Sequence, residues 1–531
     1  MKKDYCIIIL ISLIAIWPFF KKGNFESHDG EWMVIRFSAF HQTLKSGQFP
    51  VRFVDRLNNS YGYPVLNFLY PLPFYLAEIP KALGFGFVDS IKIIFVLSTV
   101  LSVVAMYWAL SQFFEKYASL AGAIVYLFIP YRFVDLYVRG SLGENLAFAI
   151  LPLVAGCIFK ITKGNMLYLP LLSISASGLI LSHNVIAILF LPLFLFISLV
   201  LIKEGRIKII GTFILGILIS TFFWLPALYD IKYVRLSQID ISRIADHLVS
   251  PLKSIAPSWG YGPNPNGEIG LSVQFGIVAL AIFLSAVYLR KTQKTKNLLI
   301  DIFLIIFILV FFSMTNFSLP IWNNLPFVDT IQFPWRLLSL VVFISAFLIA
   351  HVINTLSKKK IILAILVILA SITSTIIYTK PVAFVDRSDD FYSTNEDTTT
   401  VRDEYLPLWV KEKPFDRTYK KIEIISGIAQ IEETKILHTY YKARINVEDN
   451  TSIRVNTIYF PGWQVKADGQ KVPISFQNNF GLITFQLPQG IHEVIINYAR
   501  SPVHLASEII SISTLIGTCI YFYLLWRKRD F

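Results

Sequence analysis

Phe25-Glu-Ser-His-Asp-Gly-Glu-Trp32 follows the first apolar run of the chain and gathers Glu26, His28, Asp29 and Glu31 within eight residues. Carboxylates and an imidazole at the point where a chain leaves a bilayer can act as a general base, as metal ligands or as donors to a bound sugar. The octapeptide therefore predicts the active-site loop of a polytopic membrane enzyme. The alternative interpretation is a solvated loop in which Asp29 serves only as the N-cap of the helix that follows.

The composition is that of a membrane protein. Of the 531 residues, 55% are hydrophobic and 16% are charged, and the mean hydropathy is +0.58. A soluble chain of this size could not bury so much apolar surface, so several membrane spans are expected. The net charge of +13 comes largely from basic clusters at the ends of apolar runs, which orient membrane proteins, and we therefore expect no nucleic-acid partner. Cys6, Cys157 and Cys519 all fall in apolar segments, which argues against a disulfide framework.

Apolar runs recur along the whole chain, although several are shorter than the roughly 20 residues of a full span. They cover Tyr5–Phe20, Phe68–Leu83, Ile91–Phe113, Leu120–Ile129, Leu146–Ile161, Leu167–Leu181, Val185–Ile202, Ile207–Leu225, Val273–Leu289, Leu298–Phe312, Leu337–Val352, Ile361–Tyr378 and Ile509–Leu525. The first run has bulky and basic residues after it, as in a retained signal-anchor.

The basic clusters predict the topology. They lie at Lys203–Lys208, Arg290–Lys296, Lys358–Lys360 and Arg527–Arg529. All of them can be cytoplasmic, with both termini, if one early run does not cross. The best candidate is Phe68–Leu83, because its three prolines suit a juxtamembrane or re-entrant segment. This gives about twelve spans, or thirteen if that run crosses and another early segment is reassigned. Most of the polar connections then face outward from the plasma membrane.

The C-terminal part has a different composition. Ile453, Val455, Thr457 and Tyr459 alternate as in a half-buried strand. Asp468-Gly469 is a hairpin signal, and alternation resumes before and after Pro488-Gln-Gly490. We expect a transmembrane domain over residues 1–379, an extracytoplasmic β-sandwich-like domain over 380–504, and a terminal anchor with a basic tail over 505–531.

Several outward segments together resemble a family of bacterial multi-pass membrane proteins that carries the label 6-pyruvoyl-tetrahydropterin synthase-related and is similar to the GT-C class of glycosyltransferases. The matching pieces are His28-Asp-Gly30 with Leu44-Lys-Ser-Gly-Gln-Phe-Pro50, Tyr61-Gly-Tyr-Pro64, Leu69-Tyr-Pro-Leu-Pro-Phe-Tyr75, Tyr137-Val-Arg-Gly-Ser-Leu-Gly-Glu144, Leu181-Ser-His-Asn184 and Gln332-Phe-Pro-Trp-Arg336. Tyr459-Phe-Pro-Gly-Trp463 looks like the outer β-domain of related proteins. Nothing resembles the zinc-histidine site of the soluble pterin enzyme.

The resemblance implies sugar transfer from a polyprenyl-phosphate donor on the outer face, with an acidic residue of the first external loop as base or metal ligand and a second acid in a later loop. Asp29 fits the first role, with Glu26 as the alternative. Glu144 or Asp135 fits the second. The sequence Glu-Ser-His-Asp departs from a paired-acid motif, so both the base and any metal dependence stay open.

The residues themselves suggest how a lipid phosphate would be held. Arg336 follows Trp335 at the start of a span, and Arg139 lies beside Glu144. Arginine binds phosphate in a bidentate manner, although snorkelling of Arg336 and an Arg139–Glu144 ion pair are the simpler interpretations. His183 at the mouth of a span is either structural or part of the site. His28, Asp29, Glu144 and His183 together offer ligands for a divalent metal.

We therefore expect a membrane glycosyltransferase that uses a polyprenyl-phosphate sugar and a glycan, lipid or protein acceptor of the cell envelope. The rival hypothesis is a non-enzymatic transporter or an assembly scaffold for envelope polysaccharide. Transporters commonly bury charges at mid-membrane in repeated halves, whereas the apolar runs here carry few ionisable groups and show no internal repeat.

Overall fold

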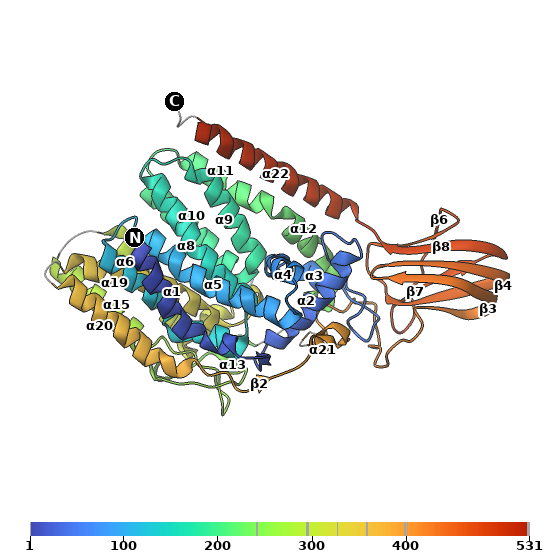
Figure 1. Ribbon diagram of the computed structural model, residues 1–531, viewed down its shortest axis with the longest axis horizontal. Coiled ribbons are helices and arrows are strands. Elements are labelled where there is room, and N and C mark those ends of the chain that lie inside the picture. The colour runs from blue at the N-terminus through green and yellow to red at the C-terminus, as the bar shows by residue number, and fades with distance from the viewer. Residues whose placement is uncertain are drawn as a thin grey trace.

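Long apolar helices form the larger part of the protein, and a β-sheet projects from one end of them (Figure 1). This computed structural model describes residues 2–239, 243–293, 297–325, 328–356, 359–397, 400 and 402–527. Within these ranges seven helical stretches are long and apolar enough to cross a membrane, and nine if each of two bent helix pairs is one span. The predicted mostly helical, multi-pass architecture with a C-terminal β-sheet and a final apolar helix is confirmed.

The seven stretches are Lys3–Phe20, Phe87–Leu110, Leu142–Thr162, Asn184–Leu201, Pro334–Thr355, Lys360–Tyr378 and Pro502–Arg527. Two shorter apolar helices, α9 (Tyr168–Ser182) and α16 (Leu298–Met314), coincide with further predicted runs. The total of twelve to thirteen spans stays a prediction, because several runs are short or broken. Lys294, Lys296, Lys358, Lys528 and Arg529 of the basic clusters lie outside the described residues.

The remaining helices of this part complete the chain order. They are α1 (Lys2–Ile16), α2 (Gly30–Lys45), α3 (Val65–Phe68), α4 (Leu72–Ala82), α5 (Phe87–Leu110), α6 (Lys116–Leu127), α7 (Pro130–Phe133), η2 (Val134–Arg139), α8 (Leu142–Thr162), α10 (Asn184–Leu201), α11 (Arg206–Ile219), α12 (Thr221–Asp230), α13 (Ile244–His247), α14 (Pro251–Ile255), α15 (Ile277–Gln293), α17 (Leu319–Trp322), α18 (Val328–Ile331), α19 (Leu338–Thr355) and α20 (Lys360–Thr375).

Prolines break two of the predicted runs. The segment Phe68–Leu83 is divided between the end of α3 and the separate helix α4, with Pro71 at the N-cap of α4 and Pro73 in its first turn. A proline has no N–H and cannot continue a helix from the preceding turn. The run Leu120–Ile129 ends before Pro130, where the chain bends by 48° and continues through α7 into the π-helical turn η2. Such π-helical turns are frequent at functional sites.

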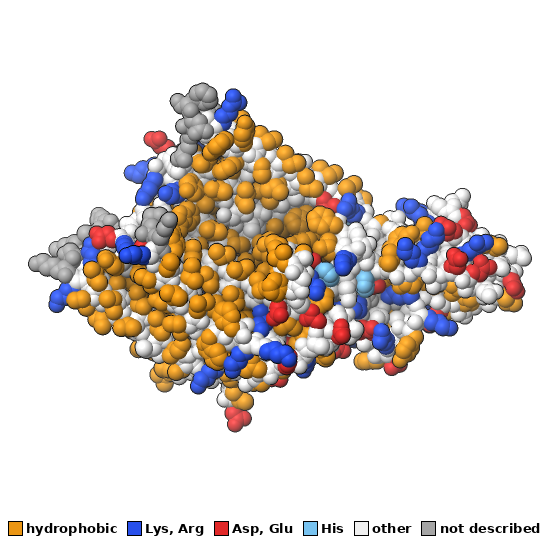
Figure 2. Space-filling model, viewed as in Figure 1, with side chains coloured by type: hydrophobic (Ala, Val, Ile, Leu, Met, Phe, Trp, Pro, Cys, Tyr) orange, Lys and Arg blue, Asp and Glu red, His pale blue; other side chains and the backbone are white. Residues whose placement is uncertain are grey.

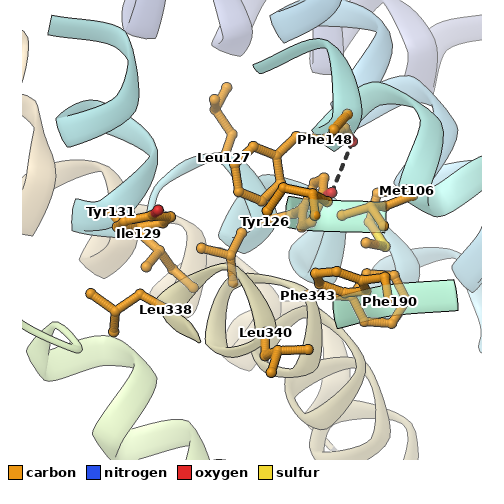
Figure 3. Close-up of a cluster of buried hydrophobic side chains, with 14 of the residues drawn as sticks. Met106, Tyr126, Leu127, Ile129, Tyr131, Phe148, Phe190, Leu338, Leu340 and Phe343 are labelled. Atoms are coloured by element: carbon orange, nitrogen blue, oxygen red, sulfur yellow. Dashed lines mark hydrogen bonds between the residues drawn. The ribbon is translucent and has the colours of Figure 1, made fainter. Parts of the chain in front are cut away.

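A buried apolar cluster joins α5, α6, α8, α10 and α19 (Figure 3). Phe190 and Phe343 stack edge to face with ring centroids 5.6 Å apart, and Phe148 packs beside Tyr126. The Tyr126 hydroxyl donates a hydrogen bond of 2.8 Å to the carbonyl oxygen of Phe148, drawn as a dashed line. Tyr131 lies in the same view, so this cluster extends to the turn that carries the charged residues described below.

The last helix, α22 (Pro502–Arg527), lies along α11 and α12 (Figure 1). It returns the chain from the sheet to the end of the helical part where α1 also begins. Figure 2 shows hydrophobic side chains covering the helical part, while charged side chains gather over the sheet and at the helix ends. This distribution is the one expected of a protein whose helices lie in lipid and whose sheet lies in water.

The C-terminal sheet is antiparallel and has six strands. They are β3 (Ile422–Leu437), β4 (Tyr440–Ile458), β5 (Trp463–Ala467), β6 (Gln470–Val472), β7 (Leu482–Leu487) and β8 (Gly490–Tyr498), in the order β3-β4-β8-β5-β6, with β7 also paired to β4. The hairpin at Asp468-Gly469 joins β5 to β6, as the sequence predicted. Pro488-Gln-Gly490 is not a hairpin turn: β7 and β8 lie one after the other along the same edge of β4, and the proline only interrupts the pairing. Both halves contribute to one apolar core.

The connection from the helices to the sheet passes over the first loop of the chain. β2 (Phe384–Val385) pairs with β1 (Asn24–Phe25), and the following helix α21 (Asp389–Thr394) packs against α2. Ser38 and Arg56 bind the carbonyl oxygen of Tyr392 in this helix. The loop that contains Asp29 is therefore covered by a segment more than 350 residues further along the chain.

Candidate functional site

The Phe25–Trp32 loop lies against the turn that ends η2. The backbone N–H groups of His28 and Asp29 donate to the carbonyl oxygens of Val138 and Arg139, at 2.9 and 2.8 Å. Gly140 permits this contact, because it has a φ of +63° and a Cβ at that position would lie 2.7 Å from the backbone nitrogen of Gly30. The local sequence therefore fixes the loop and the turn to each other.

Asp29 occupies the N-cap position of α2, but its side chain does not cap the helix. The Ser27 hydroxyl accepts from the N–H of Gly30 at 3.1 Å instead. The Asp29 carboxylate is half-buried and makes no hydrogen bond or ion pair with any residue that the structure describes. The simple helix-cap interpretation of this residue is therefore wrong, and the carboxylate is left available for a ligand.

A buried ionic cluster lies directly beyond the loop, where η2 meets the first turn of α8. Arg139 donates from Nη1 to Asp135, to Glu144 Oε2 at 2.5 Å and to the Tyr131 hydroxyl at 3.3 Å. The Tyr131 hydroxyl donates in turn to Glu144 Oε1 at 2.7 Å. Glu144 and Asp135 are completely buried. The Arg139–Glu144 ion pair weighed from the sequence is present.

Only one nitrogen of Arg139 is used in these bonds. Within the described residues, its Nε and Nη2 make no hydrogen bond, and its guanidinium lies 4.6 Å from the ring of Trp335. Arg336, next in the chain, donates from Nη1 to Gln332 Oε1 at 2.7 Å and to the Ile331 carbonyl oxygen at 3.2 Å, while its buried Nε has no partner among the described residues. Both arginines keep donors that a phosphate oxygen could accept.

His183 reaches the cluster from another helix end. Its Nδ1 accepts from the N–H of Ile186 at 3.3 Å, so it caps α10. Burial lowers the pKa of His183 to about 3, so the imidazole is neutral at physiological pH. Its ring centroid lies 5.1 Å from that of Tyr70, and its side chain interacts electrostatically with Glu144. His183 thus has a structural role, and it also borders the cluster.

The other acidic groups of the first loop are placed differently. Glu26 is exposed, and its backbone N–H pairs with Ala383. Glu31 accepts from the Tyr392 hydroxyl at 3.0 Å and pairs with Arg387 at 3.2 Å. His28 donates from Nε2 to the carbonyl oxygen of Tyr261 at 2.7 Å. Asp29 is therefore the carboxylate of this loop that is both partly sheltered and unpaired among the described residues.

The charges favour an anionic ligand. Arg132 is completely buried, and its Nε and Nη1 have no partner in the described part of the chain. Together with Arg139 and Arg336 it faces the carboxylates of Asp135 and Glu144, which leaves an excess of one positive charge when all are ionised. Asp29 and Arg36, which both act on Tyr70, add one charge of each sign.

The metal set raised from the sequence is not assembled. Within the described ranges, no group of three His, Cys, Asp or Glu side chains comes together as metal ligands. His28 and His183 each have one ring nitrogen in a backbone hydrogen bond, and both Glu144 oxygens are held by Arg139 and Tyr131. These contacts give no support to ligation by His28, Asp29, Glu144 and His183 as one set, and no step is derived through a metal.

Sequence reasoning missed the tyrosines. Tyr131 joins Arg139 to Glu144, and Tyr392 holds Glu31. Tyr70, inside a segment noted only for its prolines, has a hydroxyl that interacts with the charges of Asp29, Arg139 and Arg336. A tyrosine in an apolar run carries no signal that separates a core residue from a site residue.

Comparison with solved structures gives distant likenesses. The arabinofuranosyltransferase AftD from Mycobacteria is 12% identical with a TM-score of 0.45, over 73% of this chain and 28% of that one. The apo oligosaccharyltransferase of Archaeoglobus fulgidus is 14% identical with a TM-score of 0.41, over 74% and 56%. The complex of the same organism's AglB with an inhibitory peptide and a dolichol-phosphate is 15% identical with a TM-score of 0.40, over 74% and 55%.

Sequence comparison gives a firmer result. An uncharacterized protein of Lactococcus lactis subsp. cremoris (strain MG1363) is 26% identical over 360 residues, which are 62% of this chain and 54% of that protein. The chain thus spans about half the length of this curated relative. A family model described as "6-pyruvoyl-tetrahydropterin synthase related domain; membrane protein" matches residues 66–382. Since this match covers more than half of the chain and includes the ionic cluster, the protein belongs to the 6-pyruvoyl-tetrahydropterin synthase-related family of membrane proteins.

Proposed function

We propose that the protein is a glycosyltransferase of the plasma membrane, which moves a sugar from a polyprenyl-phosphate donor to a glycan, lipid or protein acceptor on the outer face. The observation that carries this proposal is the unpaired carboxylate of Asp29 beside a buried cluster with excess positive charge. A general base next to guanidinium groups suits the transfer of a group from a phosphate to a hydroxyl.

The chemistry follows from the positions of the charged groups. Asp29 takes the proton of an acceptor hydroxyl as its oxygen attacks the anomeric carbon of the donor. The bond between that carbon and the phosphate oxygen breaks, and its electron pair leaves with the lipid phosphate. The donors that Arg139 and Arg336 keep free stabilise this developing charge. Glu144 and Asp135 hold Arg139 in place and do not themselves need to exchange protons.

The test is cleavage of polyprenyl-phospho-sugars by purified protein in lipid nanodiscs. Asp29→Asn should reduce cleavage or transfer by a factor of about 100 to 10,000, which is the usual contribution of a general base. Its abundance should stay normal, because the carboxylate makes no bond that the fold needs. Asp386→Asn, which changes an exposed carboxylate beside the same loop, is the matched control.

Two outcomes would decide against this assignment. If Asp29→Asn keeps full activity and Glu26→Gln loses it, the base is Glu26. If the wild-type protein moves lipid-linked sugars between leaflets without breaking any bond, the protein is a transporter or scaffold.

A further inference from the structure

Tyr70 is held firmly in the connection between α3 and α4. Its ring packs against His183, and Gly143, one residue before Glu144, approaches the ring so closely that any Cβ there would collide with it. The side chain is 8% exposed, and its hydroxyl makes no hydrogen bond with any residue in the described ranges. Burial, with a further contribution from Asp29, raises the pKa of Tyr70 to about 12, so its phenol remains protonated and able to donate.

Tyr405 approaches the same place from the C-terminal part of the chain. Its ring stacks on Phe68, with centroids 5.4 Å apart and an interplanar angle of 6°. The segment around it is fixed to the loop after α12, because Leu236 N–H donates to Glu404 at 2.7 Å and Arg235 N–H donates to Leu406 at 3.0 Å. Tyr405 is therefore presented by a rigid backbone rather than by a loose linker.

The two tyrosines face each other and share their electrostatic surroundings. Burial raises the pKa of Tyr405 above its usual value, with a contribution from Glu404 and Tyr70, while Arg36 acts on both phenols in the opposite direction. The Tyr405 hydroxyl, like that of Tyr70, has no hydrogen-bond partner among the described residues. A sheltered phenol without a partner loses the hydrogen bonds it makes in water, so this arrangement favours a ligand that restores them.

We propose that Tyr70 and Tyr405 form a binding subsite for a hydroxyl-rich acceptor, most simply a pyranose ring, beside the base of the proposed reaction. Phenol hydroxyls donate to and accept from sugar hydroxyls, and tyrosine rings offer apolar faces to the C–H side of a pyranose. This inference rests on the proposed function, and it adds that the C-terminal part of the chain supplies one wall of the acceptor site.

Binding tests the subsite without requiring turnover. The affinity of methyl α- and β-pyranosides for detergent-purified protein can be measured by ligand-observed NMR. Tyr70→Phe and Tyr405→Phe should each weaken binding about three- to tenfold, as expected for one lost hydrogen bond, with an unchanged melting temperature because neither hydroxyl bonds to the protein. Tyr419→Phe removes a hydroxyl that is 92% exposed in the same part of the chain and should bind normally.

Turnover separates this inference from the proposed function. Tyr405→Phe should hydrolyse a polyprenyl-phospho-sugar in water at the wild-type rate but transfer it to the methyl pyranoside less efficiently, through a higher KM for the pyranoside. Failure of the wild-type protein to cleave any donor would contradict the proposed function, while the binding result would still stand. No pyranoside binding by the wild-type protein, or equal binding by all variants, would overturn the subsite.

Discussion

The hydrogen bond between Tyr126 and Phe148 compensates for a proline in the middle of α8. In a continuous helix the carbonyl oxygen of Phe148 would accept from the N–H of residue 152, but residue 152 is proline. The Tyr126 hydroxyl supplies the missing donor at 2.8 Å, and both side chains are completely buried. This bond also fixes α6 to α8, and these helices lead to Tyr131 and Glu144 of the ionic cluster.

Tyr126→Phe should therefore destabilise the protein by about 1–3 kcal/mol, because it leaves a buried carbonyl group without a partner. The loss should be at the upper end of this range if lipid rather than water surrounds the helices, since no solvent can replace the donor. The free energy of unfolding in mild detergent, measured by denaturant titration, gives the magnitude. Tyr521→Phe on the exposed side of α22 is the control.

A second substitution makes the test specific. Pro152→Ala restores an N–H at residue 152, so Tyr126→Phe in that background should cost less than about 1 kcal/mol. A double-mutant cycle measures this difference directly. If Tyr126→Phe costs the same in both backgrounds, the hydroxyl does not replace the missing helix bond and the reasoning is refuted.

Two further predictions concern the loop and the junction with the sheet. Gly140→Ala should lower both stability and donor cleavage, because it adds a collision with Gly30 to the roughly 1–2 kcal/mol cost of a positive φ; Gly164→Ala, with a φ of +83° and open space around it, should show only the conformational cost, and equal losses would contradict the packing argument. Burial lowers the pKa of Lys421 to about 8 against an ordinary 10.5, although Asp55 and Glu396 oppose the shift. Between these two pH values the unfolded chain holds a proton that the folded protein has released, so this residue makes the protein more stable as pH rises. Lys421→Met should flatten the rise in melting temperature over that range, and parallel curves for both proteins would contradict the assignment.

Local patterns in the sequence determined the main elements. Apolar runs predicted helices at Ile91–Phe113 and Leu146–Ile161, and α5 and α8 lie there. Prolines predicted that Phe68–Leu83 is interrupted, and the Asp468-Gly469 signal predicted the β5–β6 hairpin. These features depend on neighbouring residues, whose periodicity and backbone restrictions are written in the sequence. The same reasoning did not distinguish a hairpin at Pro488 from a pause in pairing along β4, because that choice depends on the neighbouring strand.

The site depended on contacts between distant parts of the chain. The sequence selected Asp29, Glu144, Arg139 and His183 as residue types with suitable chemistry, but only the tertiary structure decided that Asp29 is unpaired while Glu31 is bound by Tyr392, 361 residues away. It also brought Tyr405 onto Phe68 and used Tyr131 to join Arg139 to Glu144. Hydrophobicity places a segment in lipid or in a core without specifying its partner. Pairing is decided by which polar groups can satisfy one another once the helices and the C-terminal sheet are packed together.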